Sequence, residues 1–570
     1  MTADVTNNEG PLLSVVITVH HEGIIAHRTL LSVFRALEPI EAEQISYEIV
    51  INIDNGDAET IEYFQRYLDD PRFLIVHSAV SDAGLARNNA FQAARGQYIA
   101  LIDGDDLVSG NWLIEALRTA RNYSQPATIR PEVLLSFPDP DDKKEPVYIR
   151  FNSGSGSREY EAIRMIETNP WPDTLLALRD IMLAEPFPES DKQTGFEDFT
   201  LTANLIAKGV PTIVVPQTAL FYRQSWNGFW EQQKSRGVVF HYSELFETTY
   251  MQSIVLPQAD EPDTANQPHR NLAYRLIRSL YYTLQKLPII RDVAYRAYER
   301  RQIKIADKSK DQLKQALPAW LRSELAQAAR IERRLNPGEL LSGDLVRGSV
   351  SDLTTGWVYR RLIEGLPPTV DYLIFAPDYD SAKATQMVLA YTQAISQTNP
   401  DLRIAVLASG SGYGEQGWRS QLPAGVSCIE YGDLASDLAE RAKDILLTRL
   451  IVQLKVKNLH IIGSELGYDW ASRYSLYIEQ TSIKLFASVL NPGSDADTGL
   501  SSLDVIRLMR IYPLLCKLTC SGQQVFDELV QHYGMNPSRL ACHPLMTDLD
   551  SHSGRTDQVF LDSVRQDIII

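Results

Sequence analysis

The stretch YIALIDGDDL, residues 98–107, decides how the first half of this chain is expected to fold. It opens with apolar and aromatic residues, as in a strand that is buried on both faces. Three carboxylates follow directly, at Asp103, Asp105 and Asp106. Carboxylates this close together repel one another unless a cation lies among them or water surrounds them. The stretch therefore predicts a buried strand that ends either in a cation site or in a solvated turn.

Similar apolar runs precede this strand in the sequence. Runs such as LLSVVITV, YEIVINI and RFLIVHS alternate with helical patterns such as IIAHRTLLSVFRAL and AETIEYFQRYL. Continuous apolar strands separated by helices are typical of a mostly parallel sheet that is covered on both faces. We therefore predict an α/β fold for residues 11–230, with an irregular, proline-rich section over 126–190.

Each predicted strand is followed by a polar cluster. The clusters are HHEG at 20–23, DNGD at 54–57, SDAG at 81–84 and DGDD at 103–106. In parallel sheets ligands bind beyond the carboxyl ends of the strands, which lie at one edge. The clusters are therefore expected to meet there and to form one binding site.

The chemistry that suits such a site is the binding of a phosphate ester. A nucleotide diphosphate is an anion that Mg²⁺ or Mn²⁺ holds through carboxylate and phosphate oxygens. Asp103 and Asp105 provide suitable carboxylates. The alternative is a solvated turn, because Asp and Gly are turn residues. An EF-hand is excluded, since the twelfth position from Asp103 is Ile114 and not Glu.

Five segments in this order resemble the pattern of glycosyltransferase family 2, which has a GT-A fold. They are SVVITVHHEG, EIVINIDNGDAET, DAGLARNNAFQAARGQYIALIDGDD, TGFEDFTLTANLIAKG and VVPQTALFYR. The resemblance covers about residues 11–230. It implies a nucleotide-sugar-binding domain and a metal-dependent, inverting transferase of the hexosyltransferase type.

The resemblance also implies roles for single residues. Asp54 would read the base or ribose of the donor, and Asp103 would lie near the ribose or the metal. Asp105 would be the principal ligand of Mn²⁺ or Mg²⁺, and Asp198 would be the general base. The residues implied at the donor are Val19, His20, Glu22, Asp54, Asp82, Arg87, Asp103 and Arg223.

Two departures from the family pattern leave the nucleotide open. His20 and His21 stand where Tyr-Asn is common, and Asn55 stands where a second Asp often follows. The two histidines contact the donor or metal, or are structural residues at a strand end.

The arginines and the second acidic pair also have two interpretations. Arg87 and Arg223 are suited to pairing with a diphosphate, or they form salt bridges within the fold. Glu197 and Asp198 supply a base, or they favour the dipole at a helix start.

Composition narrows the class of protein. With 570 residues, 44% hydrophobic and 22% charged, the chain is expected to fold into roughly three or four globular units. No run of about 18 apolar residues and no secretory leader stand out, so we expect a cytoplasmic protein. The four cysteines suit a reducing compartment, and Cys516 and Cys520 are expected to be buried thiols and not zinc ligands.

Charge is spread unevenly along the chain. The net charge of −17 argues against nucleic-acid binding, yet residues 270–334 carry a net charge of +10. This stretch falls in a predicted helical connector, residues 231–340. Its basic and aromatic residues indicate either a bracket between domains or peripheral contact with an anionic membrane, which would suit a lipid-linked acceptor.

Residues 365–570 predict a second, Rossmann-like α/β domain. LHIIGSELGYDWASRYS and LTCSGQQVFDELVQHYGMNPSRL resemble the amino-terminal half of a GT-B glycosyltransferase. The domain would be an acceptor-binding or scaffolding module, or a part of a longer protein. Gly412, Gly414 and Gly417 fit GxGxxG, but no acidic partner follows at the usual distance, which disfavours a dinucleotide site.

The sequence therefore favours a transferase that moves a sugar from a nucleotide-sugar donor to a glycan or lipid-linked acceptor. The resemblance suggests assembly of a bacterial surface polysaccharide. The alternative is an inactive carbohydrate-binding or assembly scaffold. A nucleotidyltransferase is disfavoured, because VITVHHEG lacks a glycine-rich, basic phosphate loop. The sequence indicates neither the sugar, nor the linkage, nor the oligomeric state.

Overall fold

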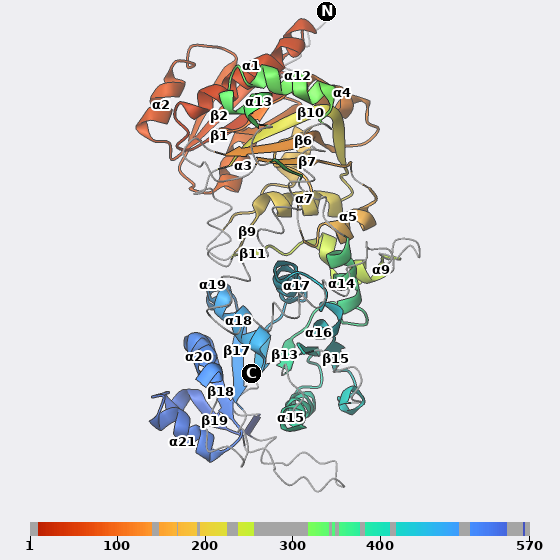
Figure 1. Ribbon diagram of the computed structural model, residues 1–570, viewed down its shortest axis with the longest axis vertical. Helices are drawn as coiled ribbons and strands as arrows, with labels where there is room; N and C mark the ends of the chain where they lie inside the picture. Colours follow the sequence, from red (N-terminus) through yellow and green to blue (C-terminus); the bar gives the residue numbers. More distant parts are fainter. Residues whose placement is uncertain are drawn as a thin grey trace, which may run out of the picture.

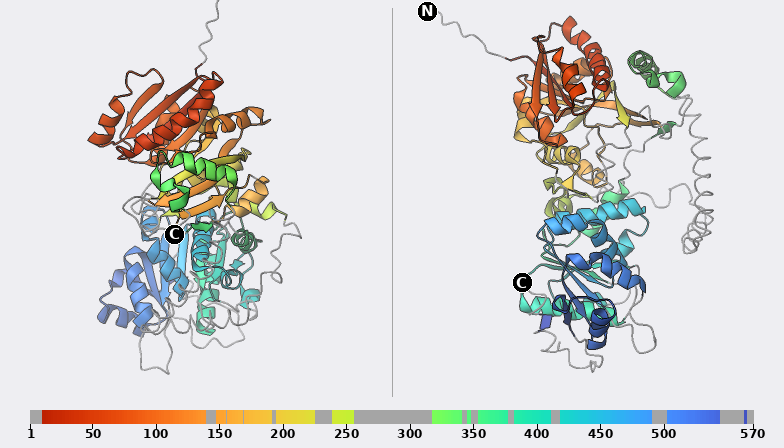
Figure 2. Two further views of the ribbon diagram at one scale, coloured as in Figure 1. Left: turned by 45° about the horizontal axis from the view of Figure 1, so that its top comes forward. Right: turned by 90° about the vertical axis from the view of Figure 1, so that its left-hand side faces the viewer.

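Two α/β units lie end to end in the computed structural model of the protein (Figures 1 and 2). The first unit is built around a sheet of ten strands, and the second around a sheet of seven. The structure describes residues 10–138, 147–154, 156–167, 169–190, 194–224, 238–255, 317–340, 345–347, 353–376, 382–410, 418–489, 502–543 and 563–564.

The first sheet has a parallel half and a mixed half. Its strands are β1 (Leu13–Val19), β2 (Tyr47–Asp54), β3 (Phe73–Ser78), β4 (Tyr98–Asp103), β5 (Leu107–Val108), β6 (Thr128–Pro138), β7 (Val147–Phe151), β8 (Leu175–Leu178), β10 (Thr212–Gln224) and β12 (Leu345–Arg347). The parallel half has the order β3-β2-β1-β4. β8 then runs antiparallel to β4, and β6 and β7 extend the sheet. β10 lies parallel to β6 and antiparallel to β5.

Helices cover both faces of the parallel half. They are α1 (Ile25–Ala42), α2 (Ala58–Gln65), α3 (Ala83–Ala93), α4 (Trp112–Asn122), α6 (Arg179–Ala184) and α7 (Glu197–Ala207), whereas α5 (Arg158–Arg164) packs toward the second unit. Alternate residues of β1 point to opposite layers, as the pleat requires. Val15 and Ile17 pack with α1 and α4, whereas Val16 packs with α3 and α7. Burial on both faces explains why the strand is a continuous apolar run and confirms the predicted α/β fold.

The section over 126–190 is more regular than predicted. It contains β6, β7, β8, α5 and α6. The prediction of an irregular section was wrong because β6 accommodates its prolines: Pro131 and Pro138 lie within the strand, whose longest pairing is with the distant β10. Proline content alone is a weak guide to a strand whose partners lie far away in sequence.

Part of the predicted connector belongs to the first unit. This part comprises α12 (Ala319–Ala328), η2 (Arg333–Leu335) and α13 (Pro337–Leu340). Leu321, Leu325 and Leu335 share an apolar cluster with Val133 and Phe221 of the sheet. β12 extends the same sheet beside β7. Residues 256–316, which hold most of the basic stretch, lie outside the described residues.

The second sheet is entirely parallel. Its strands are β13 (Tyr372–Ala376), β14 (Ile404–Ala408), β15 (Ser427–Ile429), β16 (Asn458–Ile462), β17 (Lys484–Val489), β18 (Leu515–Cys520) and β19 (Leu540–Cys542). The order is β15-β14-β13-β16-β17-β18-β19, so the chain reverses direction across the sheet between β13 and β16. This doubly wound order confirms the Rossmann-like prediction. The likeness to a GT-B half stays a prediction, and Gly412, Gly414 and Gly417 lie outside the described residues.

The helices of the second unit include two that face the first unit. The helices are α14 (Thr354–Leu362), α15 (Ala382–Thr398), α16 (Tyr431–Leu434), α17 (Glu440–Gln453), α18 (Glu465–Arg473), α19 (Ser475–Gln480), α20 (Ser502–Ile511) and α21 (Gln523–Gln531). α14 and α17 pack against α5, α7 and the short elements β9 (Thr194–Gly195), β11 (Val239–Phe240), η1 (Glu244–Phe246) and α9 (Thr248–Ser253). One apolar cluster therefore runs through both units.

The cysteines are all free thiols. Cys520 is buried, as predicted, but Cys516 is exposed. That part of the prediction was wrong because Cys516 points outward near the start of β18, where Leu515 takes the buried position. Among the described residues, no helix is both long and apolar enough to cross a bilayer.

Candidate active site

The polar clusters meet at the carboxyl edge of the first sheet. Thr18 of β1 lies opposite Asp103 of β4, so the two strands end level with each other. The amide of Gly104 donates to the carbonyl oxygen of Thr18 at 3.0 Å. A Cβ atom at Gly104 would lie 2.7 Å from that oxygen and 2.5 Å from Cγ1 of Val19. Only glycine therefore lets the acidic loop turn this tightly against β1.

The acidic loop is partly buried. Asp106 is only 2% exposed, and its Oδ1 accepts the backbone amide of Arg223 at 2.9 Å. Burial, followed by the charges of Asp105 and Asp103, raises the pKa of Asp106 well above its usual value. Pairing of β10 with β5 directly after the loop disfavours a turn that is solvated throughout, while Asp103 and Asp105 stay partly exposed.

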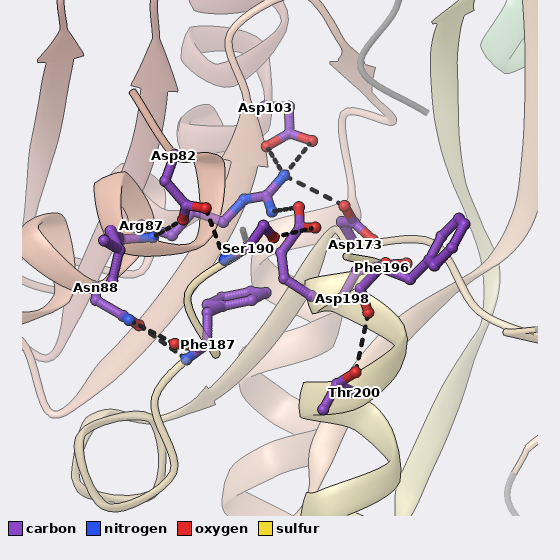
Figure 3. A network of polar contacts seen from close by, with 12 residues as sticks. Asp82, Arg87, Asn88, Asp103, Asp173, Phe187, Ser190, Phe196, Asp198 and Thr200 are labelled. Carbon is purple, nitrogen blue, oxygen red and sulfur yellow. Dashed lines mark hydrogen bonds and ion pairs between the residues drawn. The ribbon is translucent and has the colours of Figure 1, made fainter. Parts of the chain in front are cut away.

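Arg87 of α3 is the centre of the site (Figure 3). Its side chain is buried, and its Nη2 donates to both carboxylate oxygens of Asp103, at 3.0 and 3.1 Å. Nη2 also lies 3.2 Å from Oδ2 of Asp173, and Nη1 lies 3.2 Å from Oε1 of Glu197. One guanidinium thus joins acids from β4, from the loop before β8 and from the start of α7.

Electrostatics keeps Arg87 charged. Burial lowers the pKa of its guanidinium, but Asp103, Asp173 and Glu197 outweigh burial and hold the pKa above its ordinary value. One cation therefore faces three acids. For the pKa of Glu197, burial is the largest influence and raises it, Arg87 opposes this, and the net shift is upward. The site retains an excess of acidic groups.

Asp105 likewise has more acidic than basic neighbours. Burial, then Asp103 and Glu22, raise its pKa to about 7, against a lowering by Arg223. Burial also raises the pKa of Glu22, whose carboxylate accepts the backbone amide of His20. A divalent cation would relieve this crowding of acids.

The donor set is suitable for such a cation only together with a ligand. Among the described residues, no three His, Cys, Asp or Glu side chains are grouped as metal ligands. Asp103 and Asp105 are adjacent carboxylates at the sheet edge, and Asp103 is shared with Arg87. Mg²⁺ and similar hard ions are commonly held by one or two carboxylates, with phosphate and water oxygens as the other ligands. The residues present therefore fit a divalent ion that binds with a diphosphate.

Asp198 lies beside Asp173 at the start of α7. Phe196, the residue before this helix, has a left-handed φ of 60°. Nδ2 of Asn169 donates to Oδ2 of Asp198 at 3.0 Å. Burial, then the charge of Asp198, raise the pKa of Asp173 well above its usual value, and a hydrogen bond between the two acids adds to the shift. The structure thus places Asp198, the predicted base, beside Asp173, which is one of the acids that pair with Arg87.

Asp54 and Asp82 hold the loops around the site. The carboxylate of Asp54 accepts the amides of Val80 and Ser81 at 2.8 and 2.9 Å. The carboxylate of Asp82 accepts the amide of Leu85 at 2.7 Å, which caps α3. It also accepts the amide of Ser190 at 2.8 Å. Both acids are mostly buried at the sheet edge.

The two histidines link the loops after β1 and β2. Their rings stack with centroids 3.7 Å apart. Nδ1 of His20 contacts the carbonyl oxygen of Asp54, and Nε2 of His21 lies 3.0 Å from that of Asn55. Val19, just before them, is buried. The histidines thus have the structural contacts that one interpretation expects, with their outer surfaces exposed to solvent.

Arg223 forms a salt bridge within the fold, which is one of its two predicted interpretations. Its Nη2 lies 3.1 Å from Oε2 of Glu332, and its Nε donates to the carbonyl oxygen of Asp105 at 3.0 Å. Its guanidinium also lies over the ring of Phe137. Arg223 therefore ties the acidic loop to the returning segment at 317–340.

Sequence reasoning missed Asp173, Asn169, Glu332 and Tyr222. Burial and then Asp106, Asp105 and Asp173 raise the pKa of the Tyr222 phenol, which places this residue close to the acidic loop. Asp173 follows NPWP in the section that was predicted to be irregular, so no strand end marked it. Of these residues only Tyr222 could have been found, because it precedes Arg223 in a segment that the sequence already assigned to the site.

Comparison with known proteins identifies the region that carries the site. Residues 14–129 match the family model described as Glycosyl transferase family 2. EpsH of Bacillus subtilis (strain 168), which is named as a glycosyltransferase, is 28% identical to this chain over 114 residues. This alignment covers 20% of the chain and 31% of EpsH. The succinoglycan biosynthesis protein ExoM of Rhizobium meliloti (strain 1021) is 38% identical over 58 residues, which cover 10% of the chain and 19% of ExoM.

Solved structures show a more distant likeness. TarS of S. aureus in complex with UDP-GlcNAc has a TM-score of 0.32 and 14% identity, covering 50% of this chain and 83% of that one. The mannosyltransferase PcManGT of Pyrobaculum calidifontis, in complex with GDP-Man and Mn²⁺, has a TM-score of 0.28 and 15% identity, covering 40% and 62%. TM-scores this low do not extend the likeness to single residues. The part of the chain that is similar to glycosyltransferase family 2, residues 14–129, thus holds β1 to β4 and the acidic loop.

Proposed function

We propose that the protein is a glycosyltransferase that moves a sugar from a nucleotide-sugar donor to an acceptor hydroxyl, with a divalent ion and with inversion at the anomeric carbon. One observation supports this above all. The region that matches glycosyltransferase family 2 contains the partly buried loop of Asp103, Asp105 and Asp106, whose acids outnumber their cationic partners. Such a site is suited to an ion that carries a diphosphate.

Asp105, together with Asp103, would hold Mn²⁺ or Mg²⁺. When bound, the ion would stabilise the negative charge of the departing diphosphate. Arg87 restrains Asp103 through two hydrogen bonds and balances part of the acidic charge around it. Arg223 restrains the loop through a hydrogen bond to the carbonyl oxygen of Asp105 and a salt bridge with Glu332.

Asp198 is the proposed general base. It takes the proton of the acceptor hydroxyl while the acceptor oxygen forms a bond to the anomeric carbon. The bond from that carbon to the diphosphate oxygen breaks, and the diphosphate leaves with the electron pair. Asn169 orients Asp198 through the hydrogen bond to Oδ2. Glu22 lies close enough to Asp105 for its charge to raise the pKa of that residue.

The nucleoside of the donor is assigned to the edge beside β1 to β3. Val19, His20 and Asp54 form one side of this edge, and Asp82 shapes the loop on the other. The proposed acceptor is a glycan or a lipid-linked sugar, and the proposed pathway is polysaccharide assembly, which the name of ExoM supports. Peripheral contact with a membrane depends on the basic stretch, most of which lies outside the described residues.

A panel of nucleotide sugars tests the proposal. Hydrolysis and transfer are measured with Mn²⁺, with Mg²⁺ and with a chelator, for wild type, Asp105→Asn and Asp198→Asn. Asp69→Asn, which changes an exposed Asp of the same unit, is the matched control. We expect wild type to turn over one donor and to need a metal for this reaction. Both site variants should lose the turnover, whereas the control should keep it. Glycan binding without turnover of any donor by wild type would show a scaffold instead.

A further inference from the structure

A buried arginine of the second unit is enclosed by aromatic rings of the first. Arg449 of α17 is 1% exposed. Its Cζ lies 4.3 Å from the ring centroid of Phe199, 3.9 Å from that of Phe240 and 4.8 Å from that of Phe246. Its Nε donates to the carbonyl oxygen of Ile166 at 3.4 Å, and neither Nη atom has a hydrogen-bond partner. The guanidinium is therefore held mainly by the rings.

Such contacts depend on charge. Burial lowers the pKa of Arg449 to about 9, so the group is still a cation at neutral pH. A cation over an aromatic face is attracted most strongly where water is excluded. A buried and unpaired charge is costly in itself, and an apolar side chain would pack here with less penalty. Filling the interface therefore does not by itself explain why an arginine occupies this position.

The rings around Arg449 also hold the start of α7. Phe199 directly follows Asp198 in this helix. Phe240 stacks on Phe196, the left-handed residue before the helix, with centroids 4.4 Å apart. Phe240 belongs to β11, which pairs with β9 immediately before Phe196. The cation thus contacts Phe199, directly after Asp198, and is linked to Phe196, directly before Glu197, through the ring of Phe240.

Arg449 also contacts the segment just before Asn169, whose side chain donates a hydrogen bond to Asp198. Ile166, which accepts from its Nε, lies three residues before Asn169, whose side chain donates to Asp198. Close contact between α14 and α5 fixes this region further. A Cβ atom at Gly356 would lie 2.0 Å from the carbonyl oxygen of Ile163, so the helices touch through backbone atoms.

We propose that Arg449 is a positioning residue for Asp198, through which the second unit sets the geometry of the base helix. The inference rests on the proposed function. It explains how a unit without the acidic loop takes part in transfer: α17 holds the first turn of α7 and the loop that carries Asn169. The second unit then completes the active site without contacting the donor.

Arg449→Met tests the inference in the full chain, with Arg510→Met as the matched control on exposed surface of the same unit. We expect kcat for transfer to fall about tenfold or more, since small misplacement of a catalytic group is costly. The Kd of the donor with Mn²⁺ is expected to stay within about twofold. The melting temperature is expected to hold or rise, because a buried unpaired charge has been removed. Arg449→Lys should restore part of kcat.

Hydrogen exchange provides a readout that is independent of turnover. Amides of residues 196–200 should exchange faster in Arg449→Met, whereas those of α3 should not change. If the amides of residues 196–200 exchange faster in Arg449→Met while wild type turns over no donor, the proposed function fails but the coupling through Arg449 stands. Unchanged kcat and exchange in folded Arg449→Met would overturn the inference. Equal losses in kcat, donor affinity and melting temperature would also overturn it, as they would show only a general structural role.

Phe246→Leu provides a second variant if Arg449→Met fails to fold. It removes one ring from the guanidinium without changing α17. A smaller fall in kcat at constant donor Kd is expected. No change in kcat would count against the inference.

Discussion

The two units contain buried polar networks of opposite character. The network of the first unit is ionic, with Arg87 among Asp103, Asp173 and Glu197. The network of the second unit, called the neutral network because its contacts involve no carboxylate or guanidinium, joins imidazole rings and hydroxyl groups between the strands and α15. Its contacts are Tyr372 Oη to His460 Nδ1 (3.2 Å), His460 Nε2 to Ser488 Oγ (2.6 Å), Ser488 Oγ to Thr519 Oγ1 (2.5 Å), Tyr391 Oη to Thr519 Oγ1 (2.7 Å) and Tyr391 Oη to His543 Nδ1 (2.9 Å).

The difference shows how a polar network indicates chemistry. The neutral network satisfies its members internally, so it stabilises the second unit without needing a ligand. The ionic network has more acids than cations and lies at the sheet edge, so it is incomplete without a positive partner. Two parallel sheets thus differ in function because of the charges near them, not because of their topology.

The largest expected effect is on catalysis in the ionic network. Asp198→Asn should lower kcat by roughly 10²- to 10⁴-fold, because an amide cannot take the acceptor proton. The Kd of the donor should change little, since Asp198 is assigned to the acceptor side. Steady-state kinetics and calorimetry measure the two values. A large loss of donor affinity with unchanged kcat would place Asp198 at the donor instead.

The next effect concerns the stability of the same network. Arg87→Met leaves three acids without their cation and should lower the free energy of unfolding by about 3–5 kcal/mol. Denaturant unfolding measures this change. Arg121→Met, on the exposed surface of α4, is the control and should change it by less than about 0.5 kcal/mol. Equal effects of both variants would contradict an ionic centre at Arg87.

The neutral network should respond to acid. Burial, with a smaller contribution from His543, lowers the pKa of His460 to about 3. The unfolded chain, with a histidine pKa of about 6.5, binds the proton first, so the stability from neutral His460 is complete above that pH. It should fall by about 1.4 kcal/mol per pH unit as the pH drops from about 6.5 towards 3.

Hydrogen exchange in β16 and β17 at several pH values measures this slope, after correction for intrinsic exchange. His460→Gln removes the titrating group and should flatten the dependence between pH 6.5 and 5. A slope that is the same in the variant and in wild type would assign the acid response to other groups.

The smallest expected effect is the loss of one hydroxyl from the neutral network. Tyr391→Phe leaves Thr519 and His543 without a partner that both share, at an expected cost of about 1–3 kcal/mol in unfolding free energy. Tyr533→Phe, which changes a half-buried ring of the same unit, is the matched control. If both variants lose the same stability, the hydroxyl of Tyr391 has no special role.

Local patterns were enough to predict much of the fold. The run at 98–102 is a strand, and Asp103 ends it as predicted. TGFEDFTL leads into α7 at Glu197, and apolar runs mark six of the seven strands of the second unit, all except the short β19. Where the local pattern was weak, prediction failed: 126–190 contains strands whose partners are distant in sequence, and 317–340 packs on the first sheet.

For residues 11–125 and for most of the second unit, the sequence alone determined where strands, helices and the acidic loop lie, because hydrophobic periodicity and glycine placement act over a few neighbouring residues. The tertiary structure decided which charges meet. Arg87 pairs with Asp173, Arg223 with Glu332, and Arg449 lies over Phe240. Electrostatic contacts depend on distance through space, and these partners are far apart along the chain. Only the folded packing of the sheets and helices brings each cation to its partner.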